Sequence, residues 1–309
     1  MEFPRSRAVS DLTVVAESES TNDDLVARAA DANEFAVQMT TSQTAGRGRL
    51  GRVWVAPPGQ TLAASLLLKP RLADGQPLSL DRFGWLPLLA GLAMTRAISA
   101  LLPETRVALK WPNDVQIEGK KVAGLLAELL PTATGVVIGS GVNLAIPGSD
   151  LPTPVSTSLG LHGPVLVLDG TAAADGARAE GTAAADGAPA EGVTGADGTT
   201  TAADSATARS ILTGDDLIDA VLGGYLEEFR RLYSDYLGAG GDAAASGLHT
   251  AVTAACSTLG QSVRVELPGG ENLLGTATGL DPDGRLLVRP ANGPVVAVAA
   301  GDVTHLRYE

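Results

Sequence analysis

A series of apolar runs of strand length, each bounded by turn-forming residues, dominates the first half of the chain. The runs cover residues 35–41, 61–68, 106–111, 114–117, 121–129 and 135–144. Runs this short, bounded by Gly, Pro, Asn or Asp, are typical of β-strands rather than helices. This half of the sequence is therefore expected to build a sheet.

Helical patterns interrupt and follow these runs. Ser20, with Asp23 three residues later, resembles a capping box, and Ser79 similarly precedes an apolar core helix over residues 80–102. Residues 211–236 have an apolar face at helical spacing, which is expected to cover the sheet. That face consists of Leu217, Val221, Leu222, Tyr225, Phe229 and Leu232.

The C-terminal region has a different pattern, with short strands and tight turns. Candidate strands lie at residues 261–267, 273–280, 284–290 and 295–301, and Asp281, Pro282, Asp283 and Gly284 form a predicted hairpin turn. This spacing predicts a small β-barrel over residues 256–309. The predicted fold class is α+β, with a mixed domain over residues 12–250 followed by the β module.

A repetitive segment interrupts the larger domain. Residues 171–181 (TAAADGARAEG) recur as residues 182–192 with one substitution, and similar composition continues to about residue 209. Because this stretch has no aromatic and almost no branched apolar residue, it cannot bury enough surface to offset its ordering entropy. A disordered insertion is expected at about residues 165–209.

The charge balance limits the partners of this chain. Its net charge is −13, and the sequence remains acidic when the insertion is left out. Nucleic-acid binding needs clustered Lys and Arg, so a nucleic-acid surface is not expected. Neither a secretory signal nor a charge-free apolar span is evident, so we expect no membrane association and a cytoplasmic location.

One glycine-rich segment carries chemical information. In TTSQTAGRGRLGRVW, residues 40–54, glycine alternates with Arg47, Arg49 and Arg52 directly after a predicted strand. Glycine allows close backbone approach and arginine binds carboxylate or phosphate through paired donors, so the segment suits an anionic ligand. A solvated turn or an RG-type nucleic-acid segment has the same composition. A Walker loop and a dinucleotide fingerprint do not fit the spacing.

A second segment places a lysine beside a turn. Lys110 ends an apolar strand and precedes Trp111, Pro112, Asn113 and Asp114. A lysine in this position can meet a ligand, although an ordinary solvated strand end gives the same pattern. Trp111 is expected in the core, and the single cysteine, Cys256, is expected to be a packed thiol.

Together these motifs resemble the biotin protein ligase family. GRGRLGRVW and KWPNDV occur with Ser20, Thr21 and Asn22 upstream and GSGVNL downstream, in family order. The resemblance is close over about residues 12–160 and looser from residue 256. It implies a mixed sheet with flanking helices, related to class II aminoacyl-tRNA synthetases, followed by an SH3-like barrel.

The resemblance also implies a two-step reaction with ATP, Mg²⁺ and biotin. Biotin and ATP would form biotinyl-5′-AMP, and biotin would then pass to a lysine of the biotin carboxyl carrier domain of acyl-CoA carboxylases. Arg47 and Lys110 would be the catalytic cations, with Asp114 a candidate Mg²⁺ ligand in a metal site that is otherwise unassigned. Further implied binding residues for biotin or its adenylate are Ser20, Thr21, Asn22, Gln43, Gly48, Arg49, Trp54 and Asn143.

The implied roles differ along the pocket. Ser20, Thr21, Asn22 and Gln43 would bind the biotin rings. The loop with Arg47, Gly48 and Arg49 would close over the carboxylate and phosphate, and Lys110 would contact both groups. Trp54 would pack near the adenine or the biotin tail. Asn143 would approach the adenine, although a turn residue after a strand has the same pattern.

Rival interpretations remain at this point. A lipoate or octanoate ligase of related fold shares a carrier-lysine substrate, and a non-catalytic biotin-binding or scaffolding protein belongs to another class. Only nineteen residues precede Ser20, so a winged-helix DNA-binding domain is not expected. A monomer or weak dimer is expected, with the carrier protein as partner.

Overall fold

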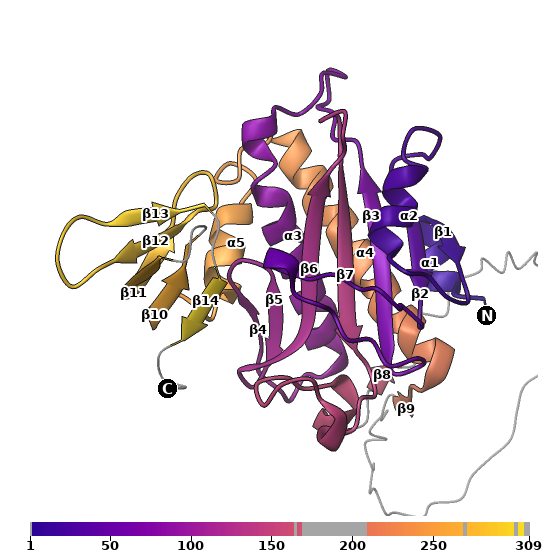
Figure 1. Cartoon of the computed structure of the whole chain (residues 1–309). Coiled ribbons are helices and arrows are strands. Elements are labelled where there is room, and N and C mark those ends of the chain that lie inside the picture. The colour runs from indigo at the N-terminus through magenta and orange to yellow at the C-terminus, as the bar shows by residue number, and fades with distance from the viewer. Residues whose placement is uncertain (1, 164–165, 169–208, 268–270, 300–301, 306–309) are drawn as a thin grey trace, which may run out of the picture.

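A computed structural model describes residues 2–163, 166–168, 209–267, 271–299 and 302–305 (Figure 1). Its centre is a seven-stranded sheet in which β1 and β2 are parallel and all other neighbours are antiparallel. The expected mixed sheet is thus confirmed. The strand order is β1 (Asp11–Val14), β2 (Ala36–Thr40), β3 (Thr61–Leu68), β7 (Val136–Asn143), β6 (Lys120–Leu129), β5 (Asp114–Ile117) and β4 (Val107–Lys110).

The two faces of the central strands differ in side-chain size. The pairs Leu62 with Val142 and Leu66 with Ile138 belong to the main core, on the face covered by α3 (Trp85–Leu101) and α4 (Gly214–Gly238) (Figure 1). Successive strand residues point to opposite faces. The residues between them, which pair Ala63 with Gly141 and Ser65 with Gly139, therefore point to the other face. Because these residues are small, they leave room for a cavity on that face.

Helix α2 (Thr21–Ala27) covers part of that second face. Leu25 packs there against Leu67 and Val137 in a separate small core. Ser20 caps the helix by accepting a hydrogen bond from the Asp23 backbone N–H at 3.3 Å, as the sequence predicts. The cap therefore fixes the start of α2, and with it the positions of Thr21 and Asn22 against the sheet.

The apolar segment after Ser79 begins differently from the prediction. A short 3-10 helix (Leu80–Arg82) comes first, and α3 begins only at Trp85. Ser79 does not cap it, because its hydroxyl donates to the Asp81 carboxylate instead. Among the described residues, one helical stretch, Leu80–Leu101, is long and apolar enough to cross a membrane, and 72% of its apolar 18-residue window is buried inside the fold.

Two short helices were not predicted from the sequence. Helix α1 (Pro4–Val9) lies against α4, where Asp219 accepts hydrogen bonds from the backbone N–H groups of Arg5 and Ser6 at 2.9 Å. Helix α5 (Leu248–Ala255) leads into the C-terminal module. Both are too short for a clear helical period, so their positions depend on tertiary contacts.

The C-terminal module is a five-stranded antiparallel sheet. Its order is β13 (Val296–Val298), β12 (Leu286–Arg289), β11 (Asn272–Leu280), β10 (Ser262–Glu266) and β14 (Asp302–His305). The predicted hairpin turn joins β11 and β12 and docks on two indoles: Trp85 Nε1 donates to Pro282 O at 2.7 Å, and Trp111 Nε1 donates to Gly284 O at 3.1 Å. Trp111 is 2% exposed and lies in the core, as expected.

Two short strands lie at the ends of the insertion that the sequence predicts at about residues 165–209. Strands β8 (Leu166–Leu168) and β9 (Arg209–Ile211) form a two-stranded antiparallel sheet in which Leu168 pairs with Arg209. The run Leu-Val-Leu is rich in strand-forming apolar residues, which the repeats lack. Residues 169–208, with the expected disorder and both repeats, lie outside the described residues.

This pairing predicts that most of the insertion can be removed. Replacing residues 170–207 by a linker of about four residues should keep the melting temperature within about 2 °C, because β8 and β9 already bring the two ends together. Thermal unfolding followed by circular dichroism tests this. A matched deletion that also removes β9 should lower the melting temperature, and equal loss in both deletions would contradict the prediction.

Candidate functional site

A cavity of about 460 Å³ lies on the face of the central sheet that carries the small residues. Its size falls in the range of small-molecule sites. The structure brings every predicted site residue to this cavity, although they come from distant parts of the chain. Those residues are Ser20, Thr21, Asn22, Gln43, Arg47, Gly48, Arg49, Trp54, Lys110 and Asn143.

One end of the cavity is a network of buried polar groups. Gln43 Oε1 accepts hydrogen bonds from the Thr21 backbone N–H at 3.0 Å and from its hydroxyl at 3.2 Å. Ser65 Oγ donates to Asn22 Oδ1 at 2.6 Å and lies 2.8 Å from Thr21 Oγ1. Thr21 and Asn22 are 3% and 5% exposed. These side chains are therefore held in fixed directions, as selective binding of a polar ring requires.

The glycine-rich segment forms a tight loop over the cavity. Gly48 N donates to Arg52 O at 2.7 Å, and Trp54 N donates to Gly46 O at 2.9 Å. A Cβ on Gly46 would lie 2.6 Å from Gln43 Nε2 and 2.9 Å from Trp54 O. Glycine is thus required at position 46 because the loop backbone runs directly against the polar end of the cavity.

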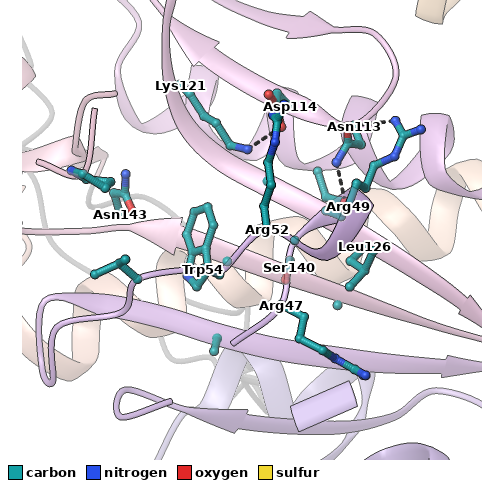
Figure 2. A pocket seen from close by; sticks show the side chains of 18 of the residues that line it. Arg47, Arg49, Arg52, Trp54, Asn113, Asp114, Lys121, Leu126, Ser140 and Asn143 are labelled. Carbon is teal, nitrogen blue, oxygen red and sulfur yellow. Dashed lines mark hydrogen bonds and ion pairs between the residues drawn. The ribbon is translucent and has the colours of Figure 1, made fainter. Parts of the chain in front are cut away.

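Trp54 lies flat against the floor of the cavity, between Asn143 and Arg52 in Figure 2. A Cβ on Gly141 would approach its ring to 2.5 Å. Lys121 Nζ lies over the ring, 5.6 Å from its centroid. The indole Nε1 is buried and has no hydrogen-bond partner among the described residues. The tryptophan thus offers an aromatic surface and one unused donor beside the cavity.

Cationic side chains surround the middle of the cavity. Lys121 forms an ion pair with Asp114 at 2.7 Å, and Arg49 Nη1 donates to Asn113 Oδ1 at 3.3 Å (Figure 2). Lys110, at the end of β4, also lines the wall. The guanidinium of Arg47 points away from this group in Figure 2. Clustered cations of this kind suit ligands with carboxylate or phosphate groups.

Several lining residues were not assigned to binding by the sequence analysis, including Lys121, Asn113 and Ser140, and Arg52 was named only as part of the segment that suits an anionic ligand. Lys121 was within reach of sequence reasoning. It follows Lys120 at the start of a strand, and consecutive strand residues point to opposite faces, so one of the two lysines had to face the cavity. The segment at residues 152–156 also lines the cavity, and no pattern in the sequence singled it out.

Asn143 ends β7 as a buried residue, 2% exposed, and does not lie in an exposed turn. Its Nδ2 donates to Thr157 O at 2.8 Å, whereas its Oδ1 is buried and has no partner among the described residues. The Thr157 hydroxyl lies 2.7 Å from His162 Nε2, and burial lowers the pKa of this histidine. The unused acceptor of Asn143 suits a ligand that carries an N–H donor.

Comparison with known proteins agrees with this site. Residues 14–143 match the family model described as "Biotin/lipoate A/B protein ligase family", and residues 258–306 match the "Biotin protein ligase C terminal domain". The biotin–[acetyl-CoA-carboxylase] ligase of Mycobacterium tuberculosis is 32% identical over 96% of this chain and 89% of its own length. The chain belongs to the biotin protein ligase family.

Other relatives of this ligase match over shorter ranges or in structure. The biotin–[acetyl-CoA-carboxylase] ligase of Paracoccus denitrificans is 40% identical over 43% of this chain and 54% of its own length. The biotin protein ligase of Aquifex aeolicus, solved with biotin and ATP, has a TM-score of 0.60 and 22% identity, covering 95% of this chain and 97% of its own. This structural match supports the biotin ligase fold.

Side chains that could bind a metal ion do not cluster in the part of the ligase that the structure describes. The described residues contain no group of three or more His, Cys, Asp or Glu side chains arranged to hold a metal ion. Asp114 lines the cavity but forms an ion pair with Lys121. Cys256 is buried near the end of β4, and this burial raises the pKa of its thiol, as expected for a packed cysteine.

The close contact between Gly141 and the Trp54 ring predicts the effect of a substitution at position 141. Gly141→Ala should displace Trp54, because the new Cβ would lie 2.5 to 2.8 Å from its ring atoms. We expect biotin affinity to fall about tenfold or more, with a shifted tryptophan emission maximum. Titration followed by intrinsic fluorescence measures both. Gly148→Ala, with nothing within 4 Å of its Cβ, is the matched control and should change neither quantity. Unchanged emission in Gly141→Ala would contradict the proposed contact.

Proposed function

We propose that this chain is an ATP-dependent ligase that forms biotinyl-5′-AMP and transfers biotin to a lysine of a carboxylase carrier domain. The observation that carries the proposal is one continuous cavity with a rigid polar end, a cationic middle and an aromatic and amide end. Biotin adenylate has the same order of groups: a polar ring system, an acyl phosphate and an adenosine.

The polar end suits the fused rings of biotin. Thr21, Asn22, Gln43 and Ser65 combine hydroxyl and amide groups in a hydrogen-bonded network, so their donors and acceptors are fixed before a ligand enters. A ureido group has two N–H donors and one carbonyl acceptor, and it can bond to such groups without reorganising them. Ser20 would keep its role as helix cap while lining the same end.

The opposite end suits a nucleotide base. Asn143 Oδ1 is a buried acceptor without a partner among the described residues, and adenine has an exocyclic amine that can donate to it. Trp54 offers its aromatic surface at the same end and would pack against the adenine or the biotin tail. An unpaired buried acceptor costs about 1 to 3 kcal/mol, which a bound amine would recover.

The cations in the middle of the cavity can neutralise the negative charge that develops in the first step. The biotin carboxylate attacks the α-phosphorus of ATP and pyrophosphate leaves, so negative charge accumulates between two anions. Lys110, Lys121 and the loop arginines Arg47 and Arg49 would neutralise that charge, and fixed donors of this kind are each worth about a hundred- to thousandfold in rate. Mg²⁺ would enter with ATP as part of the substrate, with Asp114 as a candidate ligand.

The second step places a lysine amine of the carrier domain against the mixed anhydride. The amine attacks the acyl carbon and AMP leaves. Positioning would supply much of the acceleration, which can amount to about 7 to 11 kcal/mol in favourable cases. The glycine-rich loop over the cavity would shield the adenylate from hydrolysis until the carrier binds.

Further aspects of the proposal concern organisation and partners. The larger domain (residues 12–250) would be a class II synthetase-like sheet and the module (residues 256–309) an SH3-like barrel, which the five-stranded antiparallel order supports. The partner would be a biotin carboxyl carrier domain, because the Mycobacterium tuberculosis relative is named a biotin–[acetyl-CoA-carboxylase] ligase. We propose a cytoplasmic monomer or weak dimer without nucleic-acid or membrane partners.

Biotin-dependent exchange of labelled pyrophosphate into ATP tests the adenylation step. We expect exchange in the native chain and a decrease of about a hundredfold or more in Lys110→Ala and Lys121→Ala, because each removes a cation from the reaction centre. Lys120→Ala is the matched control: Lys120 neighbours Lys121 in β6 but does not line the cavity, so its exchange should stay near native.

Two outcomes would contradict the proposal. Exchange with lipoate or octanoate but not with biotin would assign the chain to the neighbouring ligase class within the matched family. Biotin binding without exchange for any of the three acids would instead identify a non-catalytic binding protein. Transfer of labelled biotin to a purified carrier domain then tests the second step separately.

A further inference from the structure

Arg47 is held by two carboxylates beside the cavity. Its Nη2 forms an ion pair with Asp23, which belongs to the first turn of α2, and another with Glu128 Oε1 of β6 at 3.0 Å. Neither acid lines the cavity, whereas Arg47 does. The arginine at the start of the loop is therefore attached to both α2 and the sheet.

The same glutamate is connected to the polar end of the cavity. Asn22 Nδ2 donates to Glu128 Oε2 at 3.2 Å, and the same amide accepts from Ser65 Oγ. Asn22 is buried, with 5% of its surface exposed. A continuous chain of hydrogen bonds and ion pairs thus runs from the cavity floor to the loop, with Glu128 as the shared member.

We propose that Asp23 and Glu128 are positioning residues that form an electrostatic latch on Arg47. The latch, defined as Asp23, Arg47 and Glu128, restrains the glycine-rich loop and competes with an anionic ligand for the Arg47 guanidinium. An anion that reaches Arg47 must replace at least one of the two carboxylates. Glu128 also orients Asn22, so the latch connects the loop to the ring-binding end.

The exposure of these groups determines how strong the latch can be. The side chains of Asp23 and Arg47 are 59% and 46% exposed, and that of Glu128 is 28% exposed. Solvent-exposed ion pairs are individually weak and are screened by salt. Such a latch is strong enough to bias the loop and weak enough for a bound carboxylate or phosphate to open it.

The charges of the latch indicate that its carboxylates compete with an anionic ligand for Arg47 and do not only hold the loop in place. One guanidinium faces two carboxylates, so the latch carries a net charge of −1 beside a cavity that should bind anions. Removing one carboxylate charge should therefore loosen the loop and strengthen anion binding together. A purely structural contact would loosen the loop and weaken binding instead.

Limited trypsin digestion tests the restraint without any ligand, so it is independent of the proposed function. Asp23→Asn and Glu128→Gln should raise cleavage after Arg49 and Arg52 about two- to fivefold, because trypsin cleaves a loop only when its backbone unfolds locally, and the latch opposes this local unfolding. Asp31→Asn changes the charge equally at an exposed acid that makes no ion pair with Arg47 and should leave cleavage unchanged. Unchanged cleavage in both latch variants would refute the restraint.

Calorimetric titration tests the competition and rests on the proposed biotin site. In low salt, both latch variants should bind biotin about two- to fivefold more tightly but should bind the neutral biotin amide as the native chain does. In an Arg47→Gln background, the same two substitutions should have no further effect, because the guanidinium they release is gone. Weaker binding of biotin, or a gain that persists without Arg47, would overturn the proposal. No biotin binding in the native chain would overturn the proposed function and leave the digestion result standing.

Discussion

The alternation of large and small residues along β3 and β7 is the constraint on which the rest of the structure depends. Leu62, Leu66 and Val142 pack under α3 and α4, so the residues between them must face the other side of the sheet. There the sequence has Gly139 and Gly141, and a Cβ at either position would overlap Asn22 or Trp54. The register between β3 and β7 therefore determines both which residues enter the core and which form the floor of the site. A shift by one residue would turn the large side chains toward the site and the small ones toward the core.

The C-terminal module is coupled to the site through the strand that ends at Lys110. Ser257 N donates to Leu109 O at 2.8 Å, and Trp111 N donates to Thr258 Oγ1 at 3.1 Å, so the start of the module continues the edge of the central sheet. The module turn also binds both buried indoles. Gly284 has φ +79°, and a Cβ there would lie 2.9 Å from Leu88 Cδ1, so glycine permits this close docking. The module thus supports the turn that positions Asn113 and Lys110.

Much of this could be predicted from the sequence, because apolar runs and turn residues act locally. The long strands, α4 and the hairpin turn at residues 281–284 follow from such patterns, and the motifs brought together residues that share one cavity. The parallel strand β1 and the pair of β8 with β9 were not predicted, because each pairing depends on a partner far along the chain: β1 pairs with β2, and β8 pairs with β9 across the insertion. Lys121 was missed because its role depends on which face of β6 meets the cavity.

Balanced charge explains how the cations of the site coexist in a folded chain. Lys121 has Asp114 at 2.7 Å, and Arg47 has Asp23 and Glu128, so like charges near the cavity are offset by acids from α2, β5 and β6. Without these acids, mutual repulsion would oppose loop closure. An anion that enters the cavity and reaches Lys121 or Arg47 must compete with the acids that are already paired with them. If the proposed latch holds, a change that strengthens these pairs restrains the loop more firmly and weakens anion binding at the same time.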